Sequence, residues 1–461
     1  MLNSFLKIIH VRRGEKFPVL LAVLFFFFVM AALMLLRPAR EALGMQRGIE
    51  QVRWLFIGTA VVTLSVNPAF GWLVSRFRRI RFIAATYGFF GLSLVAFWAV
   101  LTFAPRAIGV TSGQVFYIWF SVFNLFSVMV CWALLTDRFT FEQSRRFFPV
   151  IAAGGTTGAI FGPWLASRLA EPFGTPALLL VAACVLVLAI ASAWALTRVL
   201  SDRQNMDSLK VATEDQQAVI GGNAWGGFRS VLRSRYLMGI AVYVVILAVV
   251  VTFIYFTRLQ MVAAMGSSMD SRTAMFARLD MVTQTATFIL QLSITGFLMK
   301  RMGVALTMAL LPLTVMFGFV GLAIAGSLMM LVALDAATKA VQRAIMRPAR
   351  ETLFTVMNRE DKYKAKAFID TFVYRGGDVI GAHIEDLLKS LGLGLIALTG
   401  VVVPMAAAWA LLGVWLGRQQ AKRSAAEVVP KKWTAGIAKA KIESERSKCP
   451  GNDASIVRSS T

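Results

Sequence analysis

The sequence alternates long apolar runs with short junctions that carry most of the charged residues. A helix of about 20 apolar residues spans the hydrocarbon core of a bilayer, and twelve runs of this size occur. They cover residues 17–37, 54–75, 82–104, 114–136, 147–167, 176–199, 236–257, 274–299, 304–326, 327–346, 367–388 and 392–416. Charged residues interrupt the eighth, tenth and eleventh runs. The pattern predicts an all-α membrane protein with about twelve transmembrane helices.

Composition narrows the class further. Apolar residues make up 57% of the 461-residue chain and charged residues 16%, whereas a soluble domain carries roughly a quarter charged residues. The net charge of +24 would suggest nucleic-acid binding in a soluble protein. Here the basic residues lie in junctions between apolar runs, where membrane topology accounts for them. We therefore predict membrane lipids as partners and no nucleic acid.

The placement of lysine and arginine predicts the orientation. Junctions after even-numbered runs are rich in basic residues, for example from Arg76 to Arg81 and from Arg359 to Lys366, whereas the junction after the third run holds Arg106 alone. Because positively charged loops stay in the cytoplasm, we predict that both termini are cytoplasmic in the cell inner membrane. The first run is too long for the apolar core of a signal peptide and is predicted to be the first span.

A long hydrophilic stretch at residues 201–235 separates six runs from six. The predicted organisation is an N-terminal six-helix half (1–200), a cytoplasmic linker (201–235), a C-terminal six-helix half (236–417) and a basic cytoplasmic tail (418–461). The tail is rich in Lys, Ser and Ala and is predicted to be disordered.

Two kinds of internal repeat relate the halves. At an offset of about 221 to 225 residues, Arg37 matches Arg258, the segment at 71–76 matches the segment at 296–301, and the Gly-Gly pair at 154–155 matches the pair at 376–377. The pentad Arg-Pro-Ala-Arg-Glu occurs at residues 37–41, after the first run, and again at residues 347–351, after the tenth. The first run crosses outward and the tenth inward, so the two pentads should lie at opposite faces. Inverted repeats nested inside parallel halves are the plan of major facilitator transporters. We therefore predict a pseudo-symmetric six-plus-six bundle and a secondary transporter.

Three stretches resemble the ATP/ADP translocase (nucleotide antiporter) family, in a divergent free-living bacterial branch of the major facilitator superfamily. They are Leu36–Glu41, Cys131–Pro149 and Arg347–Gly377. The resemblance implies a major-facilitator fold and an antiporter of nucleotides. The first family motif reads Arg-Asp-x-Lys-Asp where this chain has Arg-Pro-Ala-Arg-Glu, and Phe120 and Ile254 stand where the family has membrane glutamates. For this chain, the resemblance therefore implies a path that attracts anions. It does not specify the substrate.

Charges inside the tenth run are the first candidate for a binding site. A charge near the bilayer centre costs at least about 2.5 kcal/mol, so it usually faces a cavity or a partner. Asp335, Lys339, Arg343 and Arg347 are spaced by four residues and share one helix face. Asp335 can pair with Lys339, which leaves a cationic stripe that suits phosphate or carboxylate. The alternative is a salt-bridged seam between the halves, with Arg347 and Arg350 reaching the cytoplasmic surface.

The eighth and eleventh runs carry further polar groups. In the eighth, Asp280 and Gln284 share one face and are predicted to line a cavity. In the eleventh, Asp370, Arg375 and Asp378 are predicted to form a buried ion-pair network that holds helices together. A desolvated carboxylate in either run is also a candidate proton carrier if transport is proton-coupled.

The ends of the first and seventh runs break the positive-inside rule. Arg37, Arg40 and Arg258 lie at the predicted outer face, and we predict that they bind the substrate, with Glu41 as a gating residue. The second pentad, which ends in Glu351, would form the corresponding group at the cytoplasmic face. The alternative is a basic cap at the membrane interface, in which the proline of the pentad ends the helix.

The fifth run has glycines spaced by four, at Gly154, Gly158 and Gly162. Small residues at this spacing let helices approach closely. We predict a tight helix–helix contact here.

These observations favour a secondary active transporter that moves an organic anion by alternating access, with nucleotide or phosphate ester exchange as the resemblance implies. The sequence has no nucleophile–base pair and no metal-binding spacing, and its two histidines are isolated. We therefore expect no enzymatic activity, no catalytic residue, no metal and no cofactor. The predicted partners are an anionic small molecule and membrane lipids, and the predicted state is a monomer. A lipid flippase and a non-transporting sensor or scaffold remain alternatives.

Overall fold

The computed structural model describes residues 15–76, 79–207, 229, 231–293, 295–357, 365–366, 368–392 and 394–447. Within this part the regular secondary structure is helical. The first half contains α2 (Lys16–Gly44), η1 (Met45–Arg47), α3 (Ile49–Arg76), α4 (Arg79–Phe103), α5 (Arg106–Arg138), α6 (Phe141–Phe173) and α7 (Ala177–Asp207). The second contains α9 (Arg235–Met265), α10 (Met269–Ser293), α11 (Thr295–Ala325), α12 (Leu328–Val341), η2 (Gln342–Met346), α13 (Arg347–Leu353), η3 (Ile369–Val373), α15 (Tyr374–Ser390) and α16 (Leu395–Ser447).

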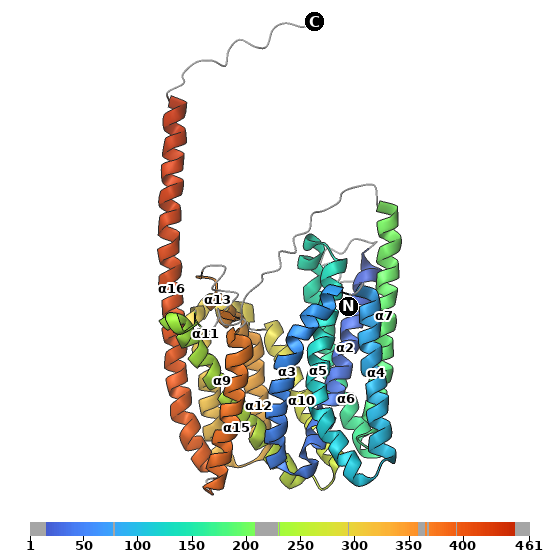
Figure 1. The fold of residues 1–461 in the computed structure, drawn as a ribbon. Helices are drawn as coiled ribbons and strands as arrows, with labels where there is room; N and C mark the ends of the chain where they lie inside the picture. The colour runs from blue at the N-terminus through green and yellow to red at the C-terminus, as the bar shows by residue number, and fades with distance from the viewer. Residues whose placement is uncertain are drawn as a thin grey trace.

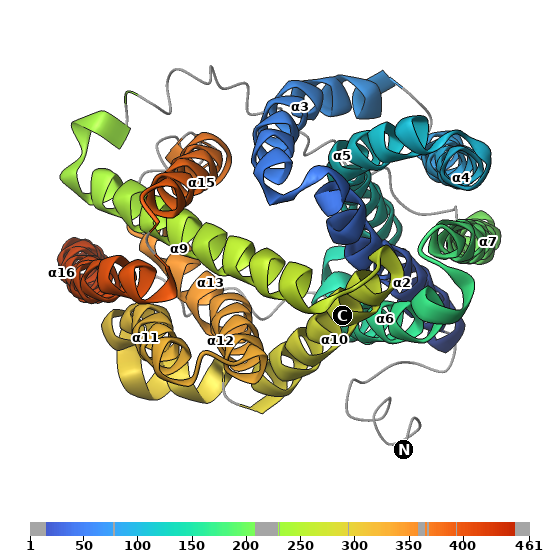
Figure 2. The ribbon, with the colours of Figure 1, turned by 90° about the horizontal axis from the view of Figure 1, so that it is seen from below.

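The helices form two bundles that lie side by side, α2 to α7 in one and α9 to α16 in the other (Figure 1). The view from below shows α10 between them (Figure 2), where it packs against α2 and α6 of the first bundle. A second contact joins α3 to α15. The chain is therefore an all-α membrane protein built as two helical bundles, as predicted.

Eight helices in the described part are long and apolar enough to cross a membrane. The other four predicted spans correspond to α6, to α10, to α12 with η2, and to η3 with α15, which are more polar. Three of these four carry the intramembrane charges on which the predicted site depends. A helix that exposes charges within a membrane needs protein or water around it, so these helices are expected to face the space between the bundles.

Glycines set the closest helix contacts in both halves. Gly158 and Gly162 of α6 lie against the backbone of α2 and leave no room for a Cβ atom, which confirms the predicted tight contact. In the second half, Gly377 and Gly381 of α15 lie against α9, where a Cβ at Gly381 would approach the Cα of Val249 to 3.0 Å. The first and seventh spans, α2 and α9, are thus each held by a glycine-bearing helix of their own bundle.

Each bundle has an apolar core of its own, and a third apolar cluster lies between them. The third cluster joins Val52, Leu55 and Tyr117 of the first bundle to Phe256 and Leu259 of the second. These side chains surround the end of α2 where the first pentad lies. We call this end of the molecule the Glu41 end, and the opposite end, where α13 carries the second pentad, the Glu351 end.

Two boundaries differ from those predicted. The tail was predicted to be disordered from residue 418, but α16 stays helical to Ser447. Ala, Lys, Glu and Arg have high intrinsic helix propensities. The charged composition of this segment is therefore compatible with a helix. In the predicted linker, α7 continues to Asp207, and residues 208–228 lie outside the described residues.

Candidate functional site

A cavity of about 490 Å³ lies between the two bundles. Both halves line it: Arg37, Thr59 and Asn124 come from the first bundle, and Lys339 and Asp378 from the second. A second cavity, of about 570 Å³, shares the Arg37, Lys339 and Arg343 side chains with the first and extends to the second pentad. The two cavities thus form one path from the molecular centre to the Glu351 end.

The path carries an excess of positive charge. Nine of its lining residues are cationic: Arg37, Arg40, Arg258, Lys339, Arg343, Arg347, Arg350, Lys366 and Arg375. Five are carboxylates: Glu41, Asp335, Glu351, Asp370 and Asp378. The excess of four positive charges makes the path attractive to anions.

At its centre, Arg258 forms a buried network with two aspartates. Its Nη1 lies 3.0 Å from Asp280 Oδ1 and 3.6 Å from Asp335 Oδ2, and its Nη2 donates to the Phe276 carbonyl at 3.3 Å. All three charged side chains are at most 5% exposed. The sequence predicted that these residues touch substrate, but their burial and mutual pairing fit a supporting network.

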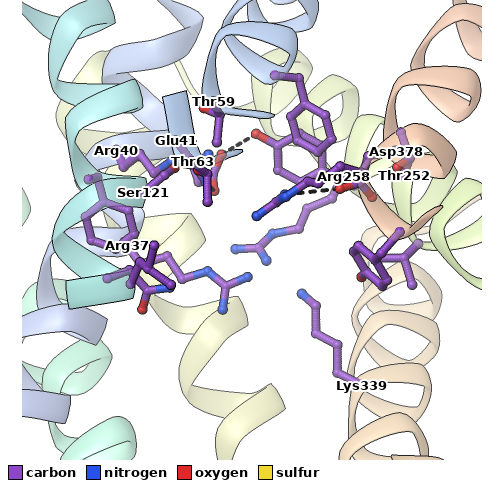
Figure 3. A pocket seen from close by; sticks show the side chains of 18 of the residues that line it. Arg37, Arg40, Glu41, Thr59, Thr63, Ser121, Thr252, Arg258, Lys339 and Asp378 are labelled. Atoms are coloured by element: carbon purple, nitrogen blue, oxygen red, sulfur yellow. Dashed lines mark hydrogen bonds and ion pairs between the residues drawn. The ribbon is translucent and has the colours of Figure 1, made fainter. Parts of the chain in front are cut away.

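Three cations are held by this network and remain accessible from the cavity. Lys339 Nζ lies 2.6 Å from Asp335 Oδ2, and Arg37 Nε lies 3.7 Å from Asp280 Oδ2. Arg343 donates to the side-chain oxygen of Gln284. The Arg37 and Lys339 side chains are 24% and 15% exposed, and Figure 3 shows both pointing into the same space. A ligand in the cavity can therefore reach all three.

Arg343 lies in a π-helical turn, η2, between α12 and α13. A π turn contains one extra residue and commonly marks a functional site. It shifts the residues after it around the helix axis, so the stripe predicted from α-helical spacing does not continue regularly. Arg347 is exposed, whereas Arg350 is buried at 8% exposure.

At the Glu351 end, the charged residues pair within the second bundle. Arg350 Nη2 lies 2.9 Å from Asp370 Oδ1, and Lys366 Nζ lies 2.5 Å from Glu351 Oε2. Glu351 is 43% exposed and Lys366 34%. Lys366 was not among the predicted site residues, although it lies inside the third stretch that resembles the translocase family, Arg347–Gly377.

At the Glu41 end, the corresponding contacts connect the bundles. The Tyr255 hydroxyl of α9 donates to Glu41 Oε2 of α2 at 2.5 Å and lies 2.8 Å from the hydroxyl of Tyr117 on α5. Arg40 Nη1 lies 2.8 Å from Glu41 Oε1, and its guanidinium lies 3.7 Å from the centre of the Tyr117 ring. Arg40, predicted to bind substrate, is thus occupied by Glu41 and Tyr117.

Further contacts between the bundles lie at the same end. Arg53 of α3 pairs with Asp386 of α15 at 2.7 Å and lies 3.6 Å from Glu385. Asp270 of α10 accepts hydrogen bonds from the backbone and the hydroxyl of Thr175 at 2.6 and 2.7 Å. These residues and both tyrosines were not predicted, because short polar patches near span ends do not reveal their partners.

On α15, Asp378 pairs with Arg375 at 3.1 Å, in agreement with the predicted ion pair of the eleventh run. Asp370, the third member of that prediction, instead pairs with Arg350. Asp378 and Arg375 both line the central cavity, and Arg375 also lines the second one.

The wall on the first bundle is mostly uncharged. Thr59 and Thr63 of α3 and Ser121 of α5 face the cavity (Figure 3), together with Phe120 and Asn124. The Thr59 and Thr63 hydroxyls are buried and have no hydrogen-bond partner in the structure. A buried hydroxyl normally finds a partner, so this wall can hydrogen-bond to uncharged polar groups of a ligand.

The described residues contain no group of three or more His, Cys, Asp or Glu side chains arranged to hold a metal ion. The many carboxylates of the site are instead engaged by arginine, lysine or tyrosine. The chemistry offered by the described part of the site is thus electrostatic binding and hydrogen bonding.

No protein-family model matches the chain, and no curated protein sequence matches it. Solved structures do match its fold. A bacterial homologue of the human lysosomal transporter Spinster, in an inward-facing and unoccupied conformation, is 13% identical over 89% of this chain and 99% of its own, with a TM-score of 0.55. The nucleoside transporter NupG is 13% identical over 88% and 98%, with a TM-score of 0.56. A peptide-bound POT family transporter is 12% identical over 87% and 96%, with a TM-score of 0.58.

These similarities cover most of this chain and nearly the whole of each solved chain, and they show that this chain shares the fold of these transporters. At 12–13% identity they establish the fold alone. The narrower resemblance to ATP/ADP translocases stays a prediction.

Proposed function

We propose that this protein is a secondary active transporter that moves an organic anion by alternating access. The observation that carries the proposal is the position of Arg37, Lys339 and Arg343, which reach from both bundles into one positively charged cavity. Buried partners hold these cations in place without neutralising all of them: Asp280 pairs with Arg37, Asp335 pairs with Lys339, and the side-chain oxygen of Gln284 accepts from Arg343. Binding between two bundles that rock about a central site is the mechanism of this fold.

The contacts between the bundles support an assignment of the conformation. Tyr255–Glu41, Arg53–Asp386 and the shared apolar cluster join the bundles at the Glu41 end, while the cavity extends toward the Glu351 end. With the predicted orientation, the Glu41 end is outside and the Glu351 end is cytoplasmic. The structure would then be an inward-open state, in which the anion exchanges with the cytoplasm.

Cavity size and chemistry support an organic phosphate or nucleotide as the substrate class. The two connected cavities measure about 490 and 570 Å³, within the range of sites for molecules of that size. Guanidinium groups bind phosphate or carboxylate oxygens in pairs, and Arg37 and Arg343 can do so from opposite bundles. The unpartnered hydroxyls of Thr59 and Thr63 suit the uncharged part of such a molecule. Exchange of two such anions is the form of transport that we propose.

The remaining assignments follow from the sequence. We propose a location in the inner membrane, with both termini in the cytoplasm and surrounding lipids as the other partners. We propose that the chain works as a monomer, since both halves of the binding path belong to one chain.

The test is thermal stabilisation of the purified protein by nucleotides, sugar phosphates, carboxylates and lipids. A ligand of the folded state stabilises it by about 2.7 kcal/mol at a hundredfold excess over Kd. We expect an organic anion to stabilise the wild type, and Arg343→Ala to lose this effect. Arg278→Ala is the matched control, because Arg278 is 59% exposed and pairs with Glu171 away from the cavity. An equal response in the Arg343→Ala protein contradicts the site.

A lipid flippase is a second candidate, favoured by one observation. An apolar groove of about 730 Å³ lies where α2 and α6 meet α10, lined by Phe27, Phe161, Trp164, Val282 and Ile289. Such a groove between the bundles could admit acyl chains while a headgroup occupies the charged cavity. Stabilisation by an anionic lipid, with no response to soluble anions, would support this candidate over the first.

A further inference from the structure

Asp378 occupies an unusual place among the carboxylates of the cavity. It lies on α15 between Gly377 and Gly381, the two glycines that bring this helix against α9. Its side chain is 7% exposed, and it faces the cavity beside Thr252 (Figure 3). Because the glycines fix α15 at close range, the carboxylate is held at the cavity wall.

Three other buried carboxylates near the cavity, Glu41, Asp280 and Asp335, each have two partners. Glu41 is held by Arg40 and by the Tyr255 hydroxyl. Asp280 is held by Arg258 and Arg37, and Asp335 by Lys339 and Arg258.

Asp378 differs in the exposure of its counter-charge: its ion pair is to Arg375, at 3.1 Å. Arg375 is 34% exposed and lines both cavities. The counter-charge of Asp378 is therefore itself open to an anion that enters the path. A buried carboxylate that loses its counter-charge is costly, and it takes up a proton instead.

We infer that the substrate anion and Asp378 compete for Arg375, so that one proton binds to the Asp378 carboxylate when the anion binds. The proton comes from the solution that fills the open cavity, and no bond other than the O–H bond forms. The bound anion then travels with one proton, which makes transport proton-coupled. This inference rests on the proposed function, since it requires an anion in the cavity.

Other charged and titratable groups also face the cavity that Asp378 lines. From α2 these are Arg37, Arg40 and Glu41; from α9, Tyr255 and Arg258; from α12 and η2, Asp335, Lys339 and Arg343; and from α15 itself, Tyr374 and Arg375. Of the neighbouring elements, η3 carries Asp370, paired with Arg350, and α3 carries Arg53, paired with Asp386. When an anion engages Arg37 or Lys339, Asp280 and Asp335 each keep Arg258 as a partner. Asp378 is the buried carboxylate whose ion pair is lost when the anion engages Arg375.

The experiment measures binding of sulfate to the purified full-length protein by isothermal titration, between about pH 5.5 and about pH 8. Sulfate keeps its double charge over this range, so any pH dependence comes from the protein. If binding takes up one proton, the affinity for sulfate falls about tenfold for each unit of pH increase, at pH values where the carboxylate of the free protein is deprotonated. We expect this slope in the wild type and its loss in Asp378→Asn, which binds tightly at every pH because the amide imitates the protonated acid.

Two further variants make the result specific. Arg375→Gln removes the cation for which the two groups compete, and we expect the pH slope to vanish there too. Asp370→Asn is the matched control: it also removes an aspartate paired with arginine near the cavity, and we expect it to keep the wild-type slope whatever its absolute affinity. Thermal unfolding of each variant confirms that it is folded.

The outcomes separate this inference from the proposed function. Sulfate binding with no pH slope in the wild type, or a slope that survives in Asp378→Asn, overturns the proton coupling and leaves the anion site intact. Absence of binding by sulfate and by every organic anion tested overturns the proposed function, and this inference with it.

Discussion

The same five residues, Arg-Pro-Ala-Arg-Glu, occur at both ends of the molecule in opposite settings. At the Glu41 end, the glutamate is 3% exposed and binds Tyr255 of the other bundle. At the Glu351 end, the glutamate is 43% exposed and binds Lys366 of its own bundle. An identical motif thus joins the two bundles at one end and pairs within a single bundle at the other.

Under the proposed alternating-access function, the repeat would supply two equivalent ends, and the conformation would decide which of them is closed. A transporter that alternates needs two closures of similar strength, because a much stronger one would trap a single state. Repeating the same residues at both ends is a direct way to match them. The comparison can be tested by weakening each end in turn.

The largest effect is expected from Glu41→Ala. It leaves Arg40 buried without its carboxylate and removes the acceptor of Tyr255, and breaking a buried pair costs about 3–5 kcal/mol. The equivalent change, Glu351→Ala, breaks a half-exposed pair worth at most about 1 kcal/mol. Thermal or denaturant unfolding of the two purified variants measures both. Equal destabilisation would contradict the contrast between the two ends.

A smaller effect is expected from Tyr255→Phe, which keeps the ring but removes the hydroxyl contacts with Glu41 and Tyr117 of the other bundle. A hydrogen bond to a charged group contributes about 1.5–3 kcal/mol, so the Glu41 end should open more often. The measurement is labelling of a cysteine at Thr63 by an impermeant thiol reagent applied to the outer face. Faster labelling is expected in Tyr255→Phe than in the parent protein. Tyr236→Phe, on the same helix but bonded within its own bundle to the Leu353 carbonyl, should label at the parent rate.

The smallest effect is expected from Arg347→Ala, since this arginine is exposed at the Glu351 end. Its loss should change the unfolding free energy by less than about 0.5 kcal/mol. It should slow the capture of anions at low salt, because exposed charges steer ligands over distance. Stopped-flow binding at two salt concentrations checks this. A loss of affinity as large as that of Arg343→Ala would move the binding site toward the Glu351 end.

Much of the fold could be predicted because membrane burial leaves a strong signal in the sequence. A run of about twenty apolar residues is long enough to span a bilayer and longer than most buried segments of soluble proteins. The two pentads, at spans of opposite direction, indicate nested repeats from the residues alone. Lys339 and Arg343 could be singled out because a charge within a membrane requires a cavity or a partner.

Other parts of the site left no comparable signal. Tyr117 and Tyr255 sit within apolar runs as ordinary aromatic residues, and their hydroxyls gain meaning only when the bundles meet. The π turn at η2 cannot be inferred from spacing, so the sequence could not distinguish the exposed Arg347 from the buried Arg350. Arg258 breaks the positive-inside rule and is visible in the sequence for that reason, but its pairing with Asp280 and Asp335 at the cavity wall emerges only from the packed helices.

Anion transport through this cavity can be measured as exchange in proteoliposomes. Vesicles containing the wild-type protein are loaded with an unlabelled organic phosphate that stabilises it, and uptake of the same labelled anion is followed. We predict uptake that internal anion accelerates and that Arg343→Ala abolishes, while Arg278→Ala transports normally. Failure of the wild type to move any stabilising anion, or undiminished exchange by Arg343→Ala, would contradict transport through this site.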